Sequence, residues 1–214
     1  ITFIENHDGL NRFRVAGVSE RRNRLAQGLV LTLPGIPCIY YGTENSVADA
    51  DGKIGEDGET GRFTYFPRVG SAPIDAVKQS ASFREISALT SLREKLPVLR
   101  TGSFIPLWSD SGADSSDDGV LAYARASEDG ESFAVIVINA SSEARVTGTA
   151  NQSMSLPHTL KIYGKQLRPV LTIGGESAGD AQSFDAAEPL RLPVPAESLV
   201  VYQAELQAVG AAQN

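Results

Sequence analysis

Two short clusters of polar residues hold the side chains that could do chemistry. The first, residues 5–8, reads Glu-Asn-His-Asp and follows the apolar run 1–4. It brings together carboxylates, an amide and an imidazole, groups that accept, donate or hold protons. The second, residues 42–45, reads Gly-Thr-Glu-Asn and follows the apolar run 36–41. Both are typical of buried strands whose last side chains face a cleft, although a strand end entering a polar turn explains the first cluster equally well.

The segment between the two clusters has the pattern of a helix. Ser19 is a suitable N-cap, apolar residues recur at helical spacing from Leu25 to Leu33, and a Pro-Gly pair ends the helix. The apolar run 36–41 is too short for a helix, so we expect a buried strand there. Two buried strands joined through a helix form a parallel βαβ unit.

A second helix and a β-rich region follow. Residues 42–76 form a long loop rich in Gly and Asp, and loops of this length are often functional. Helical periodicity returns over residues 77–95 and ends at Pro97. From Thr101, short β-prone runs alternate with turn signals, as in an antiparallel sandwich or small barrel. These runs cover residues 103–108, 120–126, 132–139, 144–148, 160–163, 167–172 and 199–204.

Composition limits the class of protein. The chain has 214 residues, of which 42% are hydrophobic and 21% charged, as in a soluble globular protein. Its net charge of −7 is spread along the chain, which argues against nucleic acid as a partner. No apolar stretch approaches the ~20 residues of a membrane span. One basic cluster stands out, for which we expect a solvated helix face: Arg12, Arg14, Arg21, Arg22 and Arg24.

Neither the single cysteine nor the first residues of the chain show whether the protein is cytoplasmic or secreted. Cys38 is the only cysteine, so no disulfide is possible within the chain, and a buried structural thiol is expected. The sequence has no signal peptide and begins inside an expected strand without an initiator Met. We therefore expect the natural N-terminus to lie upstream of Ile1.

Two motifs carry a resemblance to a known family. Residues 3–8, Phe-Ile-Glu-Asn-His-Asp, resemble the last conserved segment of the α-amylase family, glycoside hydrolase family 13. Residues 31–44, Leu-Thr-Leu-Pro-Gly-Ile-Pro-Cys-Ile-Tyr-Tyr-Gly-Thr-Glu, resemble the same family's signature around its last barrel strand. The two occur in the family's order and at about its spacing. The β-rich remainder is similar to the C-terminal β-sandwich that follows the barrel in this family.

The resemblance implies an α/β fold followed by an all-β one. Residues 1–98 would be the C-terminal portion of a catalytic (β/α)8 TIM barrel, comprising its last two βα units. Residues 99–206 would form an antiparallel β-sandwich domain. Residues 207–214 are small and polar, and we expect them to form a disordered tail. Strands and helices of an incomplete barrel expose apolar faces, so the isolated chain is expected to self-associate or to pair with the missing barrel portion.

The resemblance also implies a reaction. The parent protein would be a retaining α-glycosidase, a hydrolase or a transglycosylase, acting on α-glucans or related oligosaccharides. Retaining glycosidases use a carboxylate nucleophile and a carboxylic acid–base, and this family adds a third carboxylate that favours the positively charged transition state. Asp8 matches that third, catalytic carboxylate, and His7 matches the histidine that binds sugar hydroxyls; Glu5 and Asn6 would support them.

The implied catalytic set is incomplete in this chain. The family's nucleophile and acid–base lie on earlier strands, so residues 1–214 alone would be inactive.

Arg62, in the long loop, either reaches a bound sugar or forms a surface ion pair. No cofactor is required, but calcium is possible in the parent enzyme, with a poor EF-hand echo over residues 47–58. A non-catalytic carbohydrate-binding or partner-stabilising module is the alternative function, and for Trp108 core packing is preferred over a sugar platform.

Overall fold

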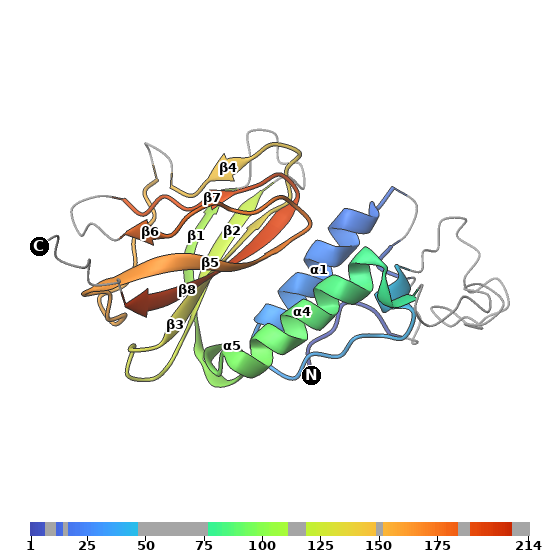
Figure 1. The fold of residues 1–214 in the computed structure, drawn as a ribbon, viewed down its shortest axis with the longest axis horizontal. Coiled ribbons are helices and arrows are strands. Elements are labelled where there is room, and N and C mark those ends of the chain that lie inside the picture. Colours follow the sequence, from blue (N-terminus) through green and yellow to red (C-terminus); the bar gives the residue numbers. More distant parts are fainter. Residues whose placement is uncertain are drawn as a thin grey trace, which may run out of the picture. The chain divides into compact units, whose positions relative to one another are not determined.

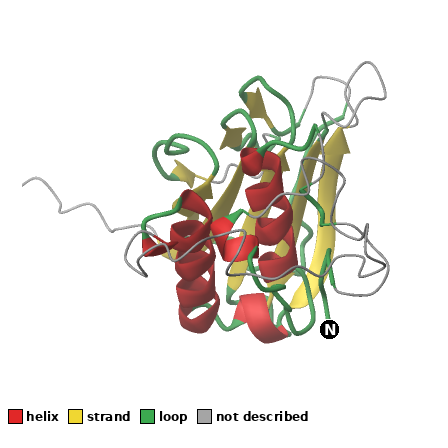
Figure 2. Cartoon of the chain, turned by 90° about the vertical axis from the view of Figure 1, so that its right-hand side faces the viewer, coloured by secondary structure: helices red, strands yellow, loops and turns green. Residues whose placement is uncertain are grey.

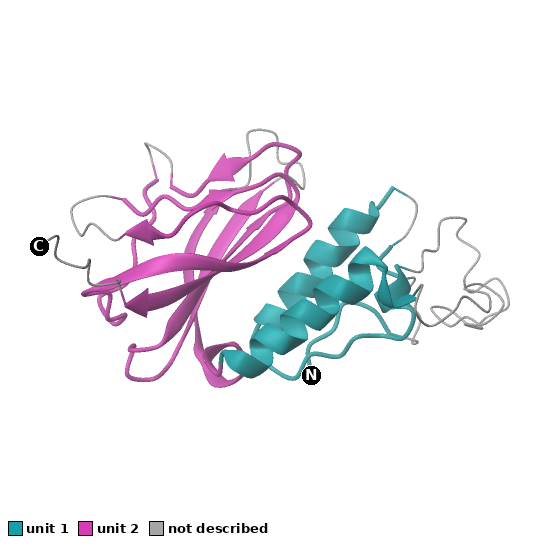
Figure 3. Ribbon diagram, viewed as in Figure 1, with its two compact units in different colours: residues 1–96 teal, residues 97–214 magenta. Residues whose placement is uncertain are grey.

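The chain divides into two compact units, residues 1–96 and 97–214 (Figure 3). The computed structural model describes residues 1–6, 12–14, 17–46, 77–110, 119–148, 152–183 and 189–206. Among these residues, no helix has the length and apolarity that a membrane span requires.

The first unit is built on two long helices, α1 (Glu20–Thr32) and α4 (Ala81–Lys95), with the short 3-10 helix η1 (Thr43–Asn45) between them in sequence. The two long helices lie side by side (Figure 1, Figure 2). Each begins at a serine cap: Ser19 Oγ accepts from the N–H of Arg22, and Ser80 Oγ accepts from the N–H of Phe83, both at 3.1 Å. The expected helix after Ser19 is confirmed.

Polar contacts show that α1 and α4 run in the same direction. Near the helix starts, Arg24 Nε lies 2.8 Å from Glu85 Oε2. Near the helix ends, the guanidinium of Arg93 donates to Leu31 O at 3.0 Å and to Gly35 O at 2.7 Å. The cation satisfies the carbonyl of Leu31, which lies in the last turn of α1 and has no intrahelical donor, and it complements the negative end of the helix dipole.

The two segments expected to be strands lie parallel, but only as a single bridge between Thr2 and Pro37. The N–H of Thr2 donates to Ile36 O, and the N–H of Cys38 donates to Thr2 O, both at 2.8 Å. The parallel direction is confirmed, whereas the expectation of two full, buried strands is wrong for the described structure. Ile1 is 86% exposed and Ile36 is 72% exposed. The physical reason is that no further strand flanks the pair in the described part of this unit.

Cys38 shares this exposure. Its side chain is a free, exposed thiol, so the expected buried structural cysteine is also wrong here. A side chain in an apolar run is buried only when neighbouring elements cover that run, and burial therefore depends on partners that the local sequence does not contain.

The second unit begins with the short helix α5 (Val98–Thr101) and continues as an antiparallel sheet of six strands. The strand order in this sheet is β1-β2-β3-β8-β5-β6. A separate two-stranded ladder joins β4 (Arg145–Val146) to β7 (Pro193–Val194). The strands of the large sheet are β1 (Ser103–Asp110), β2 (Val120–Ala126), β3 (Phe133–Asn139), β5 (Lys165–Ile173), β6 (Gln182–Ser183) and β8 (Ser198–Leu206).

The core of the second unit lies on one face of this sheet. Alternate residues such as Ala122, Val135 and Tyr202 point to that face, as the two-residue period of a strand requires. Trp108 belongs to the same cluster with 6% of its surface exposed, and its Nε1–H donates to Gln152 O at 2.9 Å. Core packing of Trp108 is therefore confirmed, and its ring is not available as a sugar platform.

The other face of the central strands is also buried, and it includes a charged side chain. Arg125 on β2 has no exposed surface. Its guanidinium donates to Leu99 O at 3.1 Å and to Gly102 O at 2.8 Å. A buried charge held by carbonyl oxygens in this way fixes the end of α5 to β2.

One expected strand is a turn. Residues 160–163 form no ladder, because the N–H of Leu160 donates to Pro157 O at 2.9 Å and closes a local turn. Leu160 is buried and Tyr163 is 98% exposed, so the apolar pattern of this run reflects packing rather than strand pairing. The short strands β6 and β7 were not predicted.

Candidate functional site

The residues predicted to act on a substrate lie outside the described residues. These are Asp8, His7 and Arg62, and the calcium echo over residues 47–58 lies outside them as well. Their roles therefore stay predictions. The described part of the chain contains no group of three or more His, Cys, Asp or Glu side chains arranged to hold a metal ion. What the structure does describe is the set of residues that flank His7 and Asp8 on both sides.

Glu5 is the centre of this set. Its side chain is 4% exposed. Glu5 Oε2 accepts from the backbone N–H of Phe13 at 2.8 Å, and Glu5 Oε1 accepts from Thr43 Oγ1. One carboxylate thus joins the segments 1–6, 12–14 and 43–46. A buried carboxylate engaged in this way organises the surrounding chain and is not presented to a ligand.

Arg12 lies beside Glu5 and is 1% exposed. Its Nη1 is 3.7 Å from Glu5 Oε1, and its guanidinium carbon is 4.3 Å from the ring centroid of Tyr40 and 5.1 Å from that of Tyr41. Burial lowers the pKa of Arg12, and the negative charge of Glu5 acts in the opposite direction. Arginine is not deprotonated in proteins, so the group keeps its charge.

The burial of Arg12 corrects the expectation of a solvated basic face. Arg21 is exposed, but Arg12 is enclosed by Glu5 and by the tyrosines of the second motif. Sequence reasoning missed this because those tyrosines are far from Arg12 along the chain. One signal was present in the sequence. Arg12 follows the first motif, residues 3–8, and the second motif, residues 31–44, contains Tyr40 and Tyr41, whose rings can bind a cation.

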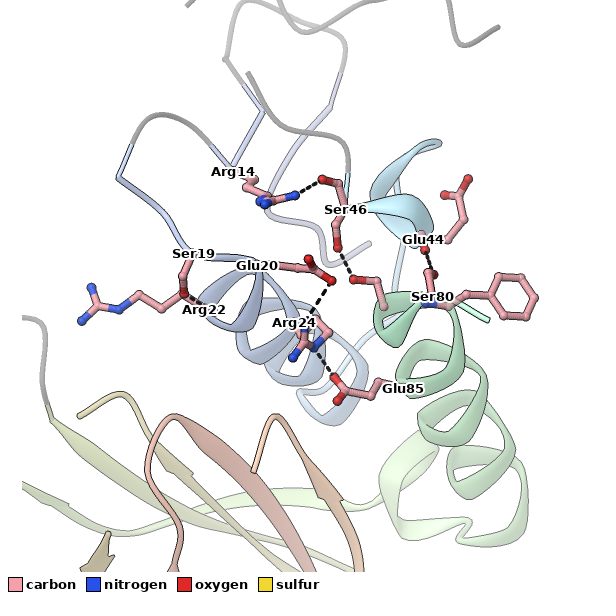
Figure 4. Close-up of polar contacts among 11 residues, drawn as sticks. Arg14, Ser19, Glu20, Arg22, Arg24, Glu44, Ser46, Ser80 and Glu85 are labelled. Atoms are coloured by element: carbon pink, nitrogen blue, oxygen red, sulfur yellow. Dashed lines mark hydrogen bonds and ion pairs between the residues drawn. The ribbon is translucent and has the colours of Figure 1, made fainter. Parts of the chain in front are cut away.

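The second polar cluster bends back towards α4. Gly42 has a φ of 88°, a left-handed conformation that glycine adopts without strain, and its N–H donates to Glu44 Oε2 at 2.8 Å. Ser80 Oγ, at the start of α4, donates to Glu44 O at 2.9 Å (Figure 4). Ser46 contacts two further segments. Its carbonyl accepts from Arg14 Nη1 (Figure 4). Its hydroxyl hydrogen-bonds with that of Ser82.

Glu5 of the first cluster and Thr43 of the second therefore join the two segments that the sequence places at the ends of neighbouring strands. The parallel bridge aligns their apolar runs, and the contact between Glu5 and Thr43 joins their polar ends. This order of extended segment, helix, extended segment, helix, with both pairs running parallel, matches the order of a βαβα unit, with the extended segments joined by a single bridge.

The sequence of this chain is similar to the sequences of several named enzymes. The cyclomaltodextrin glucanotransferase of Niallia circulans is 32% identical over 159 residues, which are 73% of this chain and 18% of that enzyme. The counterpart from Bacillus licheniformis is 31% identical over 157 residues, 73% of this chain and 18% of that enzyme. An alpha-amylase of Niallia circulans is 29% identical over 139 residues, 65% of this chain and 22% of the enzyme. No protein-family model matches the chain.

The chain belongs to the α-amylase family, glycoside hydrolase family 13. Solved structures support the fold. The Nostoc punctiforme debranching enzyme superposes on 92% of this chain and 34% of its own length, with a TM-score of 0.57 and 21% identity. CldA, a cyclomaltodextrin glucanotransferase with a three-domain ABC distribution, superposes on 96% of this chain and 36% of its own, with a TM-score of 0.59 and 22% identity. The region of sequence similarity covers 16% to 18% of the full length of three cyclomaltodextrin glucanotransferases, from Paenibacillus macerans, Bacillus licheniformis and Niallia circulans.

Proposed function

We propose that this chain is the C-terminal part of a retaining α-glycosidase that acts on α-glucans or related oligosaccharides. Residues 1–98 would be the end of its (β/α)8 barrel, and residues 99–206 its β-sandwich domain. The observation that carries the proposal is the parallel bridge between Thr2 and Pro37, combined with parallel packing of α1 and α4. Adjacent βα units of a barrel have this arrangement, and barrel active sites lie at the carboxyl ends of the strands.

The proposed roles follow from the positions of the predicted residues in the first motif. Asp8 is the third carboxylate, which strengthens its interaction with the sugar as positive charge develops on the ring. His7 donates to sugar hydroxyls, and Arg62 contributes a further contact to the substrate. The nucleophile and the acid–base come from earlier barrel strands, so residues 1–214 alone should not cleave a glycosidic bond.

Exposed apolar side chains support the need for further barrel strands. Phe3 is 46% exposed, and Ile1 and Ile36 are still more exposed. Open backbone groups and apolar side chains on such a pair invite pairing with another strand. We propose that the rest of the barrel covers them, and that the isolated chain otherwise self-associates.

Transglycosylation is the second candidate within the same chemistry, because several relatives are named cyclomaltodextrin glucanotransferases. A sugar hydroxyl would then take the place of water in resolving the covalent intermediate. A non-catalytic carbohydrate-binding or partner-stabilising module remains the third candidate, and it predicts binding without turnover.

One experiment separates these candidates. The complete reading frame that encodes the chain is expressed, and maltooligosaccharides are added. Proton NMR of the first products should show retention of the α-configuration, and product lengths should distinguish hydrolysis from transfer. Binding of maltooligosaccharides without any cleavage would instead support the non-catalytic module.

A further inference from the structure

We infer that the turn over residues 162–165 of the second unit binds α-glucan through the ring of Tyr163. The inference rests on the proposed function, which supplies α-glucan as the class of ligand. Tyr163 is 98% exposed. Among the exposed large apolar side chains described in the second unit, Leu206 follows at 74%, and the others lie between 37% and 47%. A ring so fully in water contributes nothing to the core, and it is available to a ligand.

The Tyr163 turn, residues 162–165, is fixed by backbone hydrogen bonds on both sides of the ring. The N–H of Lys165 donates to Ile162 O at 3.0 Å and closes the turn. Gly164 has a φ of 69°, a left-handed conformation that glycine adopts without strain. Just before the turn, the N–H of Lys161 donates to Gly130 O at 3.0 Å. Binding therefore needs to order only the two side-chain torsions of the tyrosine, which costs little entropy.

Charged groups on either side of the ring supply hydrogen-bonding atoms. Glu131 Oε1 lies 3.1 Å from Lys161 Nζ, and Glu131 Oε2 lies 3.2 Å from Lys165 Nζ. The hydrogen bonds with Lys161 and then Lys165 lower the pKa of Glu131, so its carboxylate stays ionised as an acceptor. The side chains of Lys161 and Glu131 are 56% and 55% exposed. Because an ammonium has three donors and a carboxylate about four acceptor positions, both groups can also bind hydroxyls.

A second exposed apolar side chain lies at the same end of the sheet. The ladder between β5 and β8 pairs Lys165 with Leu206. The Cα atoms of paired residues are about 5 Å apart, so Leu206 lies beside the residue that closes the Tyr163 turn. An aromatic ring and an aliphatic side chain thus occur next to donors and acceptors of both charges.

This combination suits a neutral sugar. A pyranose ring has an apolar face of C–H groups and a rim of hydroxyls. The negative face of an aromatic ring attracts the C–H groups, and the charged neighbours can bind the hydroxyls. A stable protein partner would need about 800 Å² of surface on each side, with few charged residues at its centre. One ring bordered by exposed ion pairs does not meet that requirement, but it is sufficient for one sugar unit.

The test uses the protein from the complete reading frame and amylopectin as the glucan. Tyr163→Ala removes the ring, and Tyr163→Phe keeps it. Val146→Ala, at a 47% exposed apolar position on β4, is the matched control. The dissociation constant for amylopectin is measured by affinity electrophoresis in native gels. The thermal midpoint, the sedimentation coefficient and the turnover of maltotetraose are recorded for each protein.

We expect Tyr163→Ala to raise the dissociation constant for amylopectin by ~10-fold, the scale of one aromatic contact. Tyr163→Phe should stay within ~2-fold of the unmodified protein, because the ring carries the contact. Val146→Ala should also stay within ~2-fold. The thermal midpoint of Tyr163→Ala should not change, since the side chain it removes is exposed to solvent.

Four results would overturn the inference. The first is no binding of amylopectin by the unmodified protein. The second is a dissociation constant of Tyr163→Ala within ~2-fold of the Val146→Ala value. The third is an equal loss of affinity in Tyr163→Ala and Tyr163→Phe. The fourth is a changed sedimentation coefficient of Tyr163→Ala with unchanged affinity, which would assign the turn to a contact between copies of the protein.

Failure of the proposed function gives a different result. An unmodified protein without turnover of maltotetraose would contradict the glycosidase assignment. Amylopectin binding by Tyr163→Ala and Tyr163→Phe would still decide whether the Tyr163 turn holds a glucan.

Discussion

The hydroxyl of Thr43 donates a hydrogen bond to the carboxylate of Glu5, 38 residues earlier in the chain. Thr43 is 1% exposed and Glu5 is 4% exposed, so the contact is shielded from water. Glu5 of the first polar cluster and Thr43 of the second are thereby parts of one network, which also includes Arg12 and the backbone N–H of Phe13.

Replacing Thr43 with valine tests this network. Thr43→Val keeps the shape of the side chain and leaves the Glu5 carboxylate with one donor fewer. We expect a loss of about 1–3 kcal/mol in the free energy of unfolding, as for a buried acceptor that loses its partner. Thr90→Val, at an exposed position on α4, is the control and should change stability by less than ~0.5 kcal/mol. Equal values for the two variants in urea unfolding would contradict the network.

Arg93 should be more important to the first unit than other arginines of α4. Arg93→Ala removes the donors to Leu31 O and Gly35 O and leaves these carbonyls without the cation. The expected loss is about 1.5–3 kcal/mol, the range for hydrogen bonds to a charged group. Arg84→Ala on the same helix is exposed and should lose less than ~0.5 kcal/mol. Chemical denaturation followed by circular dichroism measures both.

Tyr202 should make the second unit sensitive to alkali. Burial raises the pKa of Tyr202, and its hydroxyl donates to Pro193 O. An unfolded tyrosine ionises near pH ~10, so the folded state resists ionisation above that pH while the unfolded state releases the proton. The stabilisation is therefore complete below pH ~10 and is lost as the pH rises further.

The check is a comparison with Tyr202→Phe. The variant should lose about 1 kcal/mol at neutral pH, because the buried hydrogen bond is removed. Its unfolding free energy should then depend less steeply on pH above ~10 than that of the unmodified chain. Tyr163→Phe, at a 98% exposed position, is the control and should leave the slope unchanged. Identical slopes for the unmodified chain and Tyr202→Phe would show that Tyr202 titrates normally.

The exposure of Cys38 offers a probe of the proposed barrel neighbours. In residues 1–214 alone, the free thiol is exposed and should react with Ellman's reagent within seconds to minutes under native conditions. In the protein from the complete reading frame, flanking strands should cover it and slow the reaction until the protein unfolds. Equal rates in the two proteins would argue against a barrel that continues beyond this pair.

Local signals in the sequence were sufficient for the long helix α1 and for several of the longer strands. Ser19 followed by periodic apolar residues predicted α1, and the β-prone run 120–126 between turn signals predicted β2, because capping, helical periodicity and β-propensity are properties of short segments. The prediction of a strand over residues 160–163 was wrong because β-propensity alone does not distinguish a strand from a turn. The ladder of β4 and β7 was partly missed because strands of two residues carry little pattern.

Contacts between residues that are distant along the chain could not be predicted from the local sequence pattern. Arg12 and Arg125 were not predicted to be buried, because each is enclosed by partners from other elements: Tyr40 and Glu5 for Arg12, and the carbonyls of Leu99 and Gly102 for Arg125. The exposure of Ile36 has the same origin, since a strand is buried only where neighbours exist. The two motifs nevertheless predicted which segments would lie side by side.

The most direct measurement is the turnover of α-glucan by the Asp8→Asn variant of the protein from the complete reading frame. The carboxylate is exchanged for an amide of the same shape, and Asp180→Asn, at an exposed position in the second unit, serves as the control. We expect kcat for maltotetraose to fall by at least ~100-fold in Asp8→Asn, the scale for one group that stabilises a transition-state charge, and to stay unchanged in Asp180→Asn. A kcat of Asp8→Asn equal to that of the control would contradict the assignment of this chain's first motif to a glycosidase active site.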